Sequence, residues 1–196
     1  TMNNTNPFIY SDDNKRYHTL NYYNKSSFNS KVFKAVIDAG FTCPNKDGTK
    51  GTGGCIYCMG GSGYFTEKSD GEIYDSVKRQ LAAEKERIYK KHPDSLITAY
   101  FQANTNTYAP VATLKEAYTA ALDFGVHGIS IGTRADCLPD DVIALLCDIN
   151  SKTRLTVELG LQTIHDKSAQ IINRCYTYDE FLEGYRKLQE SGIRTC

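Results

Sequence analysis

The chain has 196 residues, with 23 basic and 23 acidic side chains and a formal net charge of zero. This length favours a single domain, and the balanced charge gives no support to a strongly basic nucleic-acid binder. No run of about 18 apolar residues occurs, so no membrane span is expected. The polar N-terminal residues lack the apolar segment of a secretory signal, which favours the cytoplasm. The seven cysteines in such a chain are core residues, metal ligands or reactive thiols rather than a disulfide framework.

Residues 1–30 are rich in Asn, Ser, Tyr and Lys and are expected to form an irregular N-terminal leader. Residues 31–196 form the expected domain, in which strands alternate with amphipathic helices. A capping box at Thr177 predicts the start of the last helix, and Thr113 is expected to cap the second. The predicted elements, in chain order, are a strand at 31–39, a long loop at 40–71, a helix at 72–91, a strand at 96–101, a helix at 114–124, a strand at 126–131, a helix ending near 149, a strand at 154–161, a helix at 178–190 and a strand that begins at 193.

This alternation indicates βαβ units and a parallel sheet. Two architectures fit the pattern, an open doubly wound sheet and a whole or partial β/α barrel. Both place ligands at the carboxyl ends of the strands, where the polar loops 40–71, 102–112, 132–138 and 162–176 lie. Glu158 lies inside the fourth strand, and alternation is expected to place it on the outside of the sheet, paired with a helix lysine.

Cys43, Cys55 and Cys58 form a C-x11-C-x2-C pattern in the glycine-rich loop after the first predicted strand. Three thiolates leave a tetrahedral zinc site one ligand short, but they suit a 4Fe–4S cluster whose fourth iron is open. A zinc site completed by His18 or solvent, and a loop of merely buried cysteines, are the alternatives. The remaining four cysteines are expected to be bystanders, most of them in packing: Cys137, Cys147, Cys175 and Cys196.

The chain resembles the radical S-adenosylmethionine (SAM) enzymes and, more narrowly, their YhcC-type branch. The resemblance runs over essentially the whole chain, and its wider relatives are oxygen-independent coproporphyrinogen oxidases and elongator-type radical SAM acetyltransferases. It implies an α/β fold, a partial β/α barrel of the radical SAM type truncated after about four βα units. The stretches that carry it are 16–23 (RYHTLNYY), 38–45 (DAGFTCPN), 48–58 (GTKGTGGCIYC) and 100–108 (YFQANTNTY).

By this resemblance Cys43, Cys55 and Cys58 would hold a 4Fe–4S cluster, and Tyr57, inside the C-x2-C pair, would lie beside the SAM adenine. The open iron of such a cluster chelates the amino and carboxylate groups of SAM. Both the cluster and SAM are therefore expected cofactors.

Further SAM contacts are implied after the second, third and fourth strands. Asn104 and Thr105 occupy the segment where relatives carry a glycine-rich turn for the SAM amino group. Gly132 replaces an acidic residue that relatives often have after the third strand. Gln162 would reach the ribose or methionine part. Arg174, in a stretch (NRCYT) that resembles the relatives' N-R-G-H-T, would pair with the SAM carboxylate.

The implied activity is reductive cleavage of SAM to a 5′-deoxyadenosyl radical, which abstracts hydrogen from a substrate. The implied partner is a reductant such as flavodoxin or ferredoxin. The sequence does not indicate the substrate, and the neutral charge gives transfer RNA no particular support. Two alternatives stay open, a non-catalytic zinc- or iron–sulfur-binding module and an inactive fragment of the enzyme. Because the last predicted strand only begins at residue 193, the chain is expected to be the N-terminal part of a longer protein.

Overall fold

The structure is a computed structural model that describes residues 8, 14–58 and 69–196. Its parallel strands form one sheet whose order, β1-β2-β3-β4-β5, follows the chain. A doubly wound sheet reverses its strand order at a switch point, and this sheet has no reversal among the described residues. The partial barrel, one of the two expected architectures, is therefore confirmed. The strands are β1 (Val32–Ile37), β2 (Leu96–Phe101), β3 (Gly128–Thr133), β4 (Arg154–Leu159) and β5 (Arg194–Thr195).

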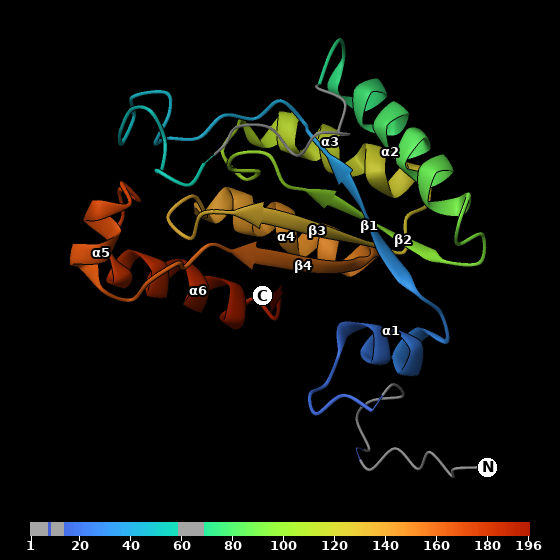
Figure 1. Cartoon of the computed structure of the whole chain (residues 1–196). Helices are drawn as coiled ribbons and strands as arrows, with labels where there is room; N and C mark the ends of the chain where they lie inside the picture. Colours follow the sequence, from blue (N-terminus) through green and yellow to red (C-terminus); the bar gives the residue numbers. More distant parts are fainter. Residues whose placement is uncertain (1–7, 9–13, 59–68) are drawn as a thin grey trace.

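Helices connect the strands and pack on one face of the sheet. Figure 1 shows α2, α3 and α4 grouped on this outer side, with α6 beside β4 near the C-terminus. The capping box predicted at Thr177 is present, since its hydroxyl accepts from the Glu180 backbone N–H and the Glu180 carboxylate accepts in return. The connecting helices are α2 (Ile73–Tyr89), α3 (Val111–Phe124), α4 (Asp140–Lys152), α5 (Asp166–Ile171) and α6 (Tyr178–Glu190). No described helix is long and apolar enough to span a membrane.

The two faces of the sheet differ sharply in chemistry because successive side chains alternate between them. The outer face meets the helices and carries the core, which includes the fully buried Ala35, Ile37, Phe101, Ile131 and Val157. The inner face, on the concave side of the partial barrel, carries mainly polar side chains: Lys34, Thr98, Tyr100, Ser130, Thr156 and Glu158. Any ligand inside the barrel would therefore meet polar groups.

Three local expectations differ from the structure. The leader contains a helix, α1 (Leu20–Phe28), which the Thr19 hydroxyl caps by accepting from the Tyr22 backbone N–H at 3.0 Å and which ends at Asn29 with φ 51°. The segment expected as a loop after β4 contains the short helix α5. Helix α3 begins at Val111, with Pro110 at the N-cap position, so the expected cap at Thr113 lies inside the helix. Part of the long loop, 59–68, lies outside the described residues.

Candidate functional site

A cavity of about 460 Å³ opens at the carboxyl ends of the strands, and all three predicted cysteines line it. The loop after β1 turns tightly at Cys43, whose carbonyl accepts from the Lys46 backbone N–H at 2.8 Å. A second turn joins the other two cysteines, since the Cys58 N–H donates to the Cys55 carbonyl at 2.9 Å. The C-x2-C spacing thus keeps two thiols adjacent, and the path of the loop returns them toward the third.

The three thiols are free, and they differ in exposure: Cys43 is buried, Cys55 is half-buried and Cys58 is exposed. Within residues 8, 14–58 and 69–196, no group of three His, Cys, Asp or Glu side chains is arranged to hold a metal ion. The donor chemistry nevertheless fits an iron–sulfur cluster, because three soft sulfur ligands share one cavity that has room for a further small molecule. Binding a cluster would require the three sulfur atoms to move into an arrangement that can hold metal.

The zinc alternative required His18 or solvent as a fourth ligand. His18 instead packs edge-on against Tyr22, with 5.3 Å between ring centroids, and also contacts Tyr23 of α1. Tyr23 lines a cavity at the amino ends of the strands, whereas the three cysteines line the one at the carboxyl ends. Completion of a zinc site by His18 is therefore not supported.

A short network anchors the cysteine loop to the segment between α5 and α6. The Asn45 amide donates to the Cys55 sulfur at 3.4 Å and also to the Asn173 carbonyl. The Asn173 amide donates to the Gly54 carbonyl at 2.8 Å. At Gly51 an added Cβ would lie 2.3 Å from Asn45 Oδ1, so a larger residue there would force the Asn45 side chain out of this network. Sequence reasoning missed Asn45, although it lies only two residues after Cys43.

Tyr57 lines the same cavity from inside the C-x2-C turn, with 48% of its surface exposed. Burial raises the pKa of its phenol, and the neighbouring Cys55 raises that pKa further, so the hydroxyl stays protonated. A neutral, partly exposed aromatic ring at the cavity wall is suited to stacking on a flat heterocycle.

Asn104 and Thr105, which follow β2, also line the cavity. Asn104 adopts φ 60°, the left-handed conformation that glycine would otherwise supply, which explains how a segment without glycines makes this turn. Its amide donates to the Phe41 carbonyl at 2.7 Å, and its carbonyl accepts from Lys46 at 2.6 Å. Thr105 is 1% exposed, and its backbone N–H donates to the Thr42 carbonyl at 3.2 Å. These contacts join the loop after β2 to the cysteine loop.

Gln162 lines the cavity after β4 and is another non-glycine residue in the left-handed region, with φ 57°. Its side chain lies over Gly160, where an added Cβ would come within 2.4 Å of the Gln162 amide nitrogen. The Gly160 N–H donates to the Thr133 carbonyl at 3.3 Å, which extends the pairing of β3 with β4 into this loop.

Arg174 borders the cavity, but its guanidinium is committed to the protein backbone. It is 1% exposed, and four of its N–H groups are used. Nη1 donates to the Leu161 and Thr163 carbonyls, each at 2.6 Å, while Nε and Nη2 donate to the Tyr176 carbonyl at 3.1 and 2.9 Å. Its cation lies 4.3 Å from the Tyr176 ring centroid. One Nη2–H is left for a ligand. The pairing with the SAM carboxylate stays a prediction, and it is limited to this one N–H.

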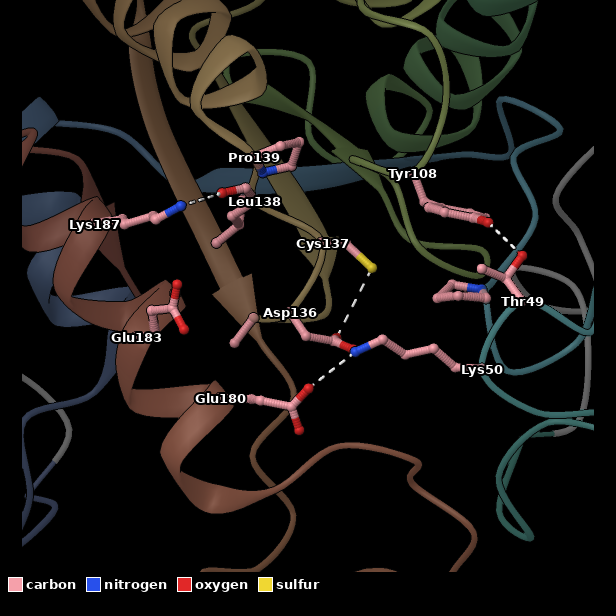
Figure 2. Close-up of a pocket in the computed structure, with 13 residues that line it drawn as sticks. Thr49, Lys50, Tyr108, Asp136, Cys137, Leu138, Pro139, Glu180, Glu183 and Lys187 are labelled. Carbon is pink, nitrogen blue, oxygen red and sulfur yellow. Dashed lines mark hydrogen bonds and ion pairs between the residues drawn. The ribbon is translucent and has the colours of Figure 1, made fainter.

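An ion-pair network joins the cysteine loop to the loop after β3. Figure 2 shows part of it, Lys50 with Asp136 and Glu180, in a second cavity of about 390 Å³. Arg134 grips Asp136 with two hydrogen bonds, at 2.9 and 2.8 Å, and Lys50 of the cysteine loop reaches Asp136 at 2.7 Å and Glu180 of α6 at 3.1 Å. Burial alone would raise the pKa of Asp136, but hydrogen bonds from Arg134 and Lys50 outweigh it and hold that pKa below its usual value. The loop after β3 is thereby attached to the cysteine loop.

Glu158 was expected on the outer face of the sheet, toward the helices. It lies instead on the inner face. Its carboxylate pairs with Lys34 of β1 on the same face, and the Lys34 ammonium lies 3.9 Å from the ring centroid of Tyr100. Burial and the Glu158 carboxylate raise the pKa of Tyr100 to about 12. The expected pairing with a helix lysine was therefore wrong: the outer positions of β4 are apolar, and the polar position points into the barrel.

Two further expectations concern residues near the site. Gly132, which stands where relatives often carry an acid, also lines the cavity, and an added Cβ there would lie 3.3 Å from the Phe101 carbonyl. The backbone therefore leaves little room for a side chain at this position. Among the four cysteines expected to be bystanders, Cys137 is buried and Cys175 is half-buried, whereas Cys147 and Cys196 are exposed and do not act in packing.

The fold and site together define a partial β/α barrel with a cysteine-lined cavity at the carboxyl ends of its strands. The chain belongs to the Radical SAM superfamily, whose family model matches residues 47–196. This match covers Cys55 and Cys58 and all of the strands after β1.

Relatives come from bacteria and an archaeon. The chain is 48% identical to the YtqA protein of Bacillus subtilis over all of its own length and 60% of the relative. It is 35% identical to the YhcC protein of Escherichia coli K12, over 86% of this chain and 53% of that protein. It is 33% identical to the MJ0486 protein of Methanocaldococcus jannaschii, over 89% of this chain and 53% of that protein. The chain thus spans between half and two thirds of the length of these relatives. Its identity to them agrees with a YhcC-type branch of the superfamily.

Proposed function

We propose that this chain is the core of a radical SAM enzyme, in which Cys43, Cys55 and Cys58 hold a 4Fe–4S cluster and the adjoining cavity binds SAM. The observation that carries the proposal is the gathering of three free cysteines in one cavity at the carboxyl ends of the strands. Parallel α/β folds place their ligands at this edge. The cavity volume of about 460 Å³ falls in the range of small-molecule sites.

The cluster, when bound, would supply the electron that cleaves SAM to a 5′-deoxyadenosyl radical. The chain's own residues bind SAM and orient it. Tyr57 offers its ring to the adenine, and Gln162 reaches the ribose or methionine part. Asn104 and Thr105 form the wall near the amino group, and the remaining N–H of Arg174 is directed to the carboxylate. We propose a flavodoxin- or ferredoxin-type reductant as the electron source.

Metal analysis after anaerobic reconstitution with iron and sulfide tests the cluster ligands. We expect about four irons per chain, the content of one such cluster, and a brown protein. Cys55→Ala should lose the iron, because one of three sulfur ligands is gone. Cys147→Ala is the matched control, since Cys147 is an exposed free cysteine on α4 and should leave the iron content unchanged. Stoichiometric zinc that persists through the reconstitution would favour a zinc module instead.

A further inference from the structure

A second cavity, of about 260 Å³, lies inside the partial barrel near the amino ends of the strands. Helix α1 contributes Leu20, Tyr23 and Phe28 to its wall, and the inner-face side chains of the strands supply the rest. Figure 1 shows α1 close to the start of β1, whereas the cysteine loop follows the far end of that strand. The wall is mixed, with aromatic rings on one side and polar side chains on the other.

Cations dominate the charged groups in this cavity. Arg154, Arg194 and Lys34 line it, against the single carboxylate side chain of Glu158, which pairs with Lys34. In the part of the chain that the structure describes, neither arginine makes an ion pair with a carboxylate. Both guanidinium groups instead donate to one neutral acceptor, the Tyr23 hydroxyl. The distance from Arg194 Nη1 to the Tyr23 hydroxyl oxygen is 3.2 Å. Two positive charges in one small cavity thus have no carboxylate partner among residues 8, 14–58 and 69–196.

A ring nitrogen of His127 in the same cavity is also buried without a partner among the described residues. Nε2 of His127 is shielded from solvent and has no hydrogen-bond partner among the described residues. The ring of His127 packs against Phe28, with 4.5 Å between centroids, and lines the cavity beside the arginines. A buried polar atom without a partner costs roughly 1–3 kcal/mol, so its position needs an explanation. An acceptor in the cavity would satisfy it.

The electrostatics of the neighbouring groups agree with a cavity that attracts an anion. Burial would raise the pKa of Tyr23, but hydrogen bonds from Arg194 and Arg154 outweigh burial and lower that pKa. Burial, and then the positive charge of Arg154, lower the pKa of His127. The two guanidinium groups therefore make negative charge in this cavity less costly and disfavour a further positive charge on the imidazole.

We propose that this cavity binds an oxyanion, a phosphate or carboxylate group, held by Arg154, Arg194 and the Nε2–H of His127. Guanidinium groups recognise both kinds of oxyanion with charge-assisted hydrogen bonds. The cavity is smaller than those that enclose drug-sized ligands, which suits one acidic group rather than a whole cofactor.

Glu158 connects this site to the cysteine-lined cavity, because it lines both. Polar side chains of the inner face, including Thr98, Ser130 and Thr156, also line the smaller cavity. On the proposed function, the oxyanion is the acidic end of the substrate, and the rest of the substrate extends toward the SAM cavity. The substrate class is then a small phosphorylated or carboxylated molecule.

Calorimetric titration of the purified protein with inorganic phosphate and, separately, with malonate tests the site in the absence of SAM. We expect saturable binding of at least one of them, and the tighter of the two distinguishes a phosphate from a carboxylate site. Arg194→Gln should weaken that binding about tenfold, which corresponds to one charged hydrogen bond. Arg194 is exposed, so its replacement should disturb the fold less than replacement of Arg154. The guanidinium carbon of Arg154 lies 5.0 Å from the ring centroid of Phe28. Arg186→Gln, a change at an exposed arginine of α6, is the matched control and should bind as the unmodified protein does.

Nitrogen NMR of the imidazole rings supplies a second readout that a merely structural role would not move. The chain has four histidines, so the His127 signals can be assigned with a His127→Phe variant. The expected result is a saturable shift of the His127 nitrogen signals on addition of the anion that binds. No binding of either anion, or equal binding by the Arg194→Gln and Arg186→Gln variants, would overturn the proposal. Because the titration uses no SAM, such a failure would leave the proposed radical chemistry untouched.

Discussion

Replacing Arg174 by alanine separates two roles that this residue has been given, a support of the fold and a partner of SAM. The substitution removes four hydrogen bonds to three backbone carbonyls, those of Leu161, Thr163 and Tyr176. A buried acceptor left without a partner costs about 1–3 kcal/mol. The Leu161 carbonyl keeps a hydrogen bond from the Thr163 backbone N–H, so only the other two carbonyls lose their partner, which sets an upper range of roughly 2–6 kcal/mol. Water entering the vacated space will recover part of this cost. We therefore expect a loss of about 2–4 kcal/mol in the free energy of unfolding, a large share of the roughly 5–15 kcal/mol typical of a domain.

Urea unfolding of the protein, followed by circular dichroism without SAM, measures this loss. Arg186→Ala removes an exposed arginine from α6 and should change the free energy of unfolding by less than about 0.5 kcal/mol. A loss below about 1 kcal/mol for Arg174→Ala would refute the structural role. It would mean that the guanidinium is not needed by these carbonyls and is free to bind the SAM carboxylate, as the resemblance implies.

Two further predictions concern the loop after β3. Gly184→Ala should destabilise the protein by about 1–3 kcal/mol, because the added Cβ would lie 2.0 Å from the Ala135 carbonyl oxygen and would push α6 off this loop; thermal unfolding measures the loss. The pKa of Asp136 is held below its usual value, so its ion pairs stabilise the fold fully above about pH 4 and lose that effect as pH falls through the lowered pKa. Asp136→Asn should therefore lower stability at neutral pH and flatten its decline in acid, as measured by urea unfolding at a series of pH values.

Each of these two has a control and a contradicting result. Glu183→Ala, at an exposed position next to Gly184, should shift the melting temperature little, and an equal shift in both variants would argue against the clash. For Asp136→Asn, a fall in the free energy of unfolding at low pH as steep as that of the unmodified protein would contradict the prediction. It would show that other carboxylates control the stability in acid.

The strand and helix order was predictable from the sequence because each element has a strong apolar period and clear ends. Helix α1 was missed because its Asn, Ser and Tyr residues give weak apolar periodicity, and its signal was the single cap at Thr19. Helix α5 was missed because six residues are too short for a period to show. The barrel was one of two choices until the strand order was known, since βαβ spacing does not encode where a sheet reverses.

The candidate site was predictable as a set of residues but not as a set of contacts. The cysteine spacing and the polar ends of the strands identified the cavity wall. The hydrogen bonds from Arg174 and Asn104 to backbone carbonyls were not predictable, because they join loop segments that become neighbours only in the folded structure. Alternation correctly sets Glu158 opposite Val157, but which of the two faces is the inside depends on how the sheet curves.

Formation of 5′-deoxyadenosine from SAM by the reduced, reconstituted protein tests the central proposal most directly. We predict that the unmodified protein and Cys147→Ala form it, and that Cys58→Ala does not, because Cys58 is one of three ligands in the cavity and Cys147 is an exposed residue of α4. A protein that carries its full complement of iron and sulfide but releases no 5′-deoxyadenosine would contradict the account.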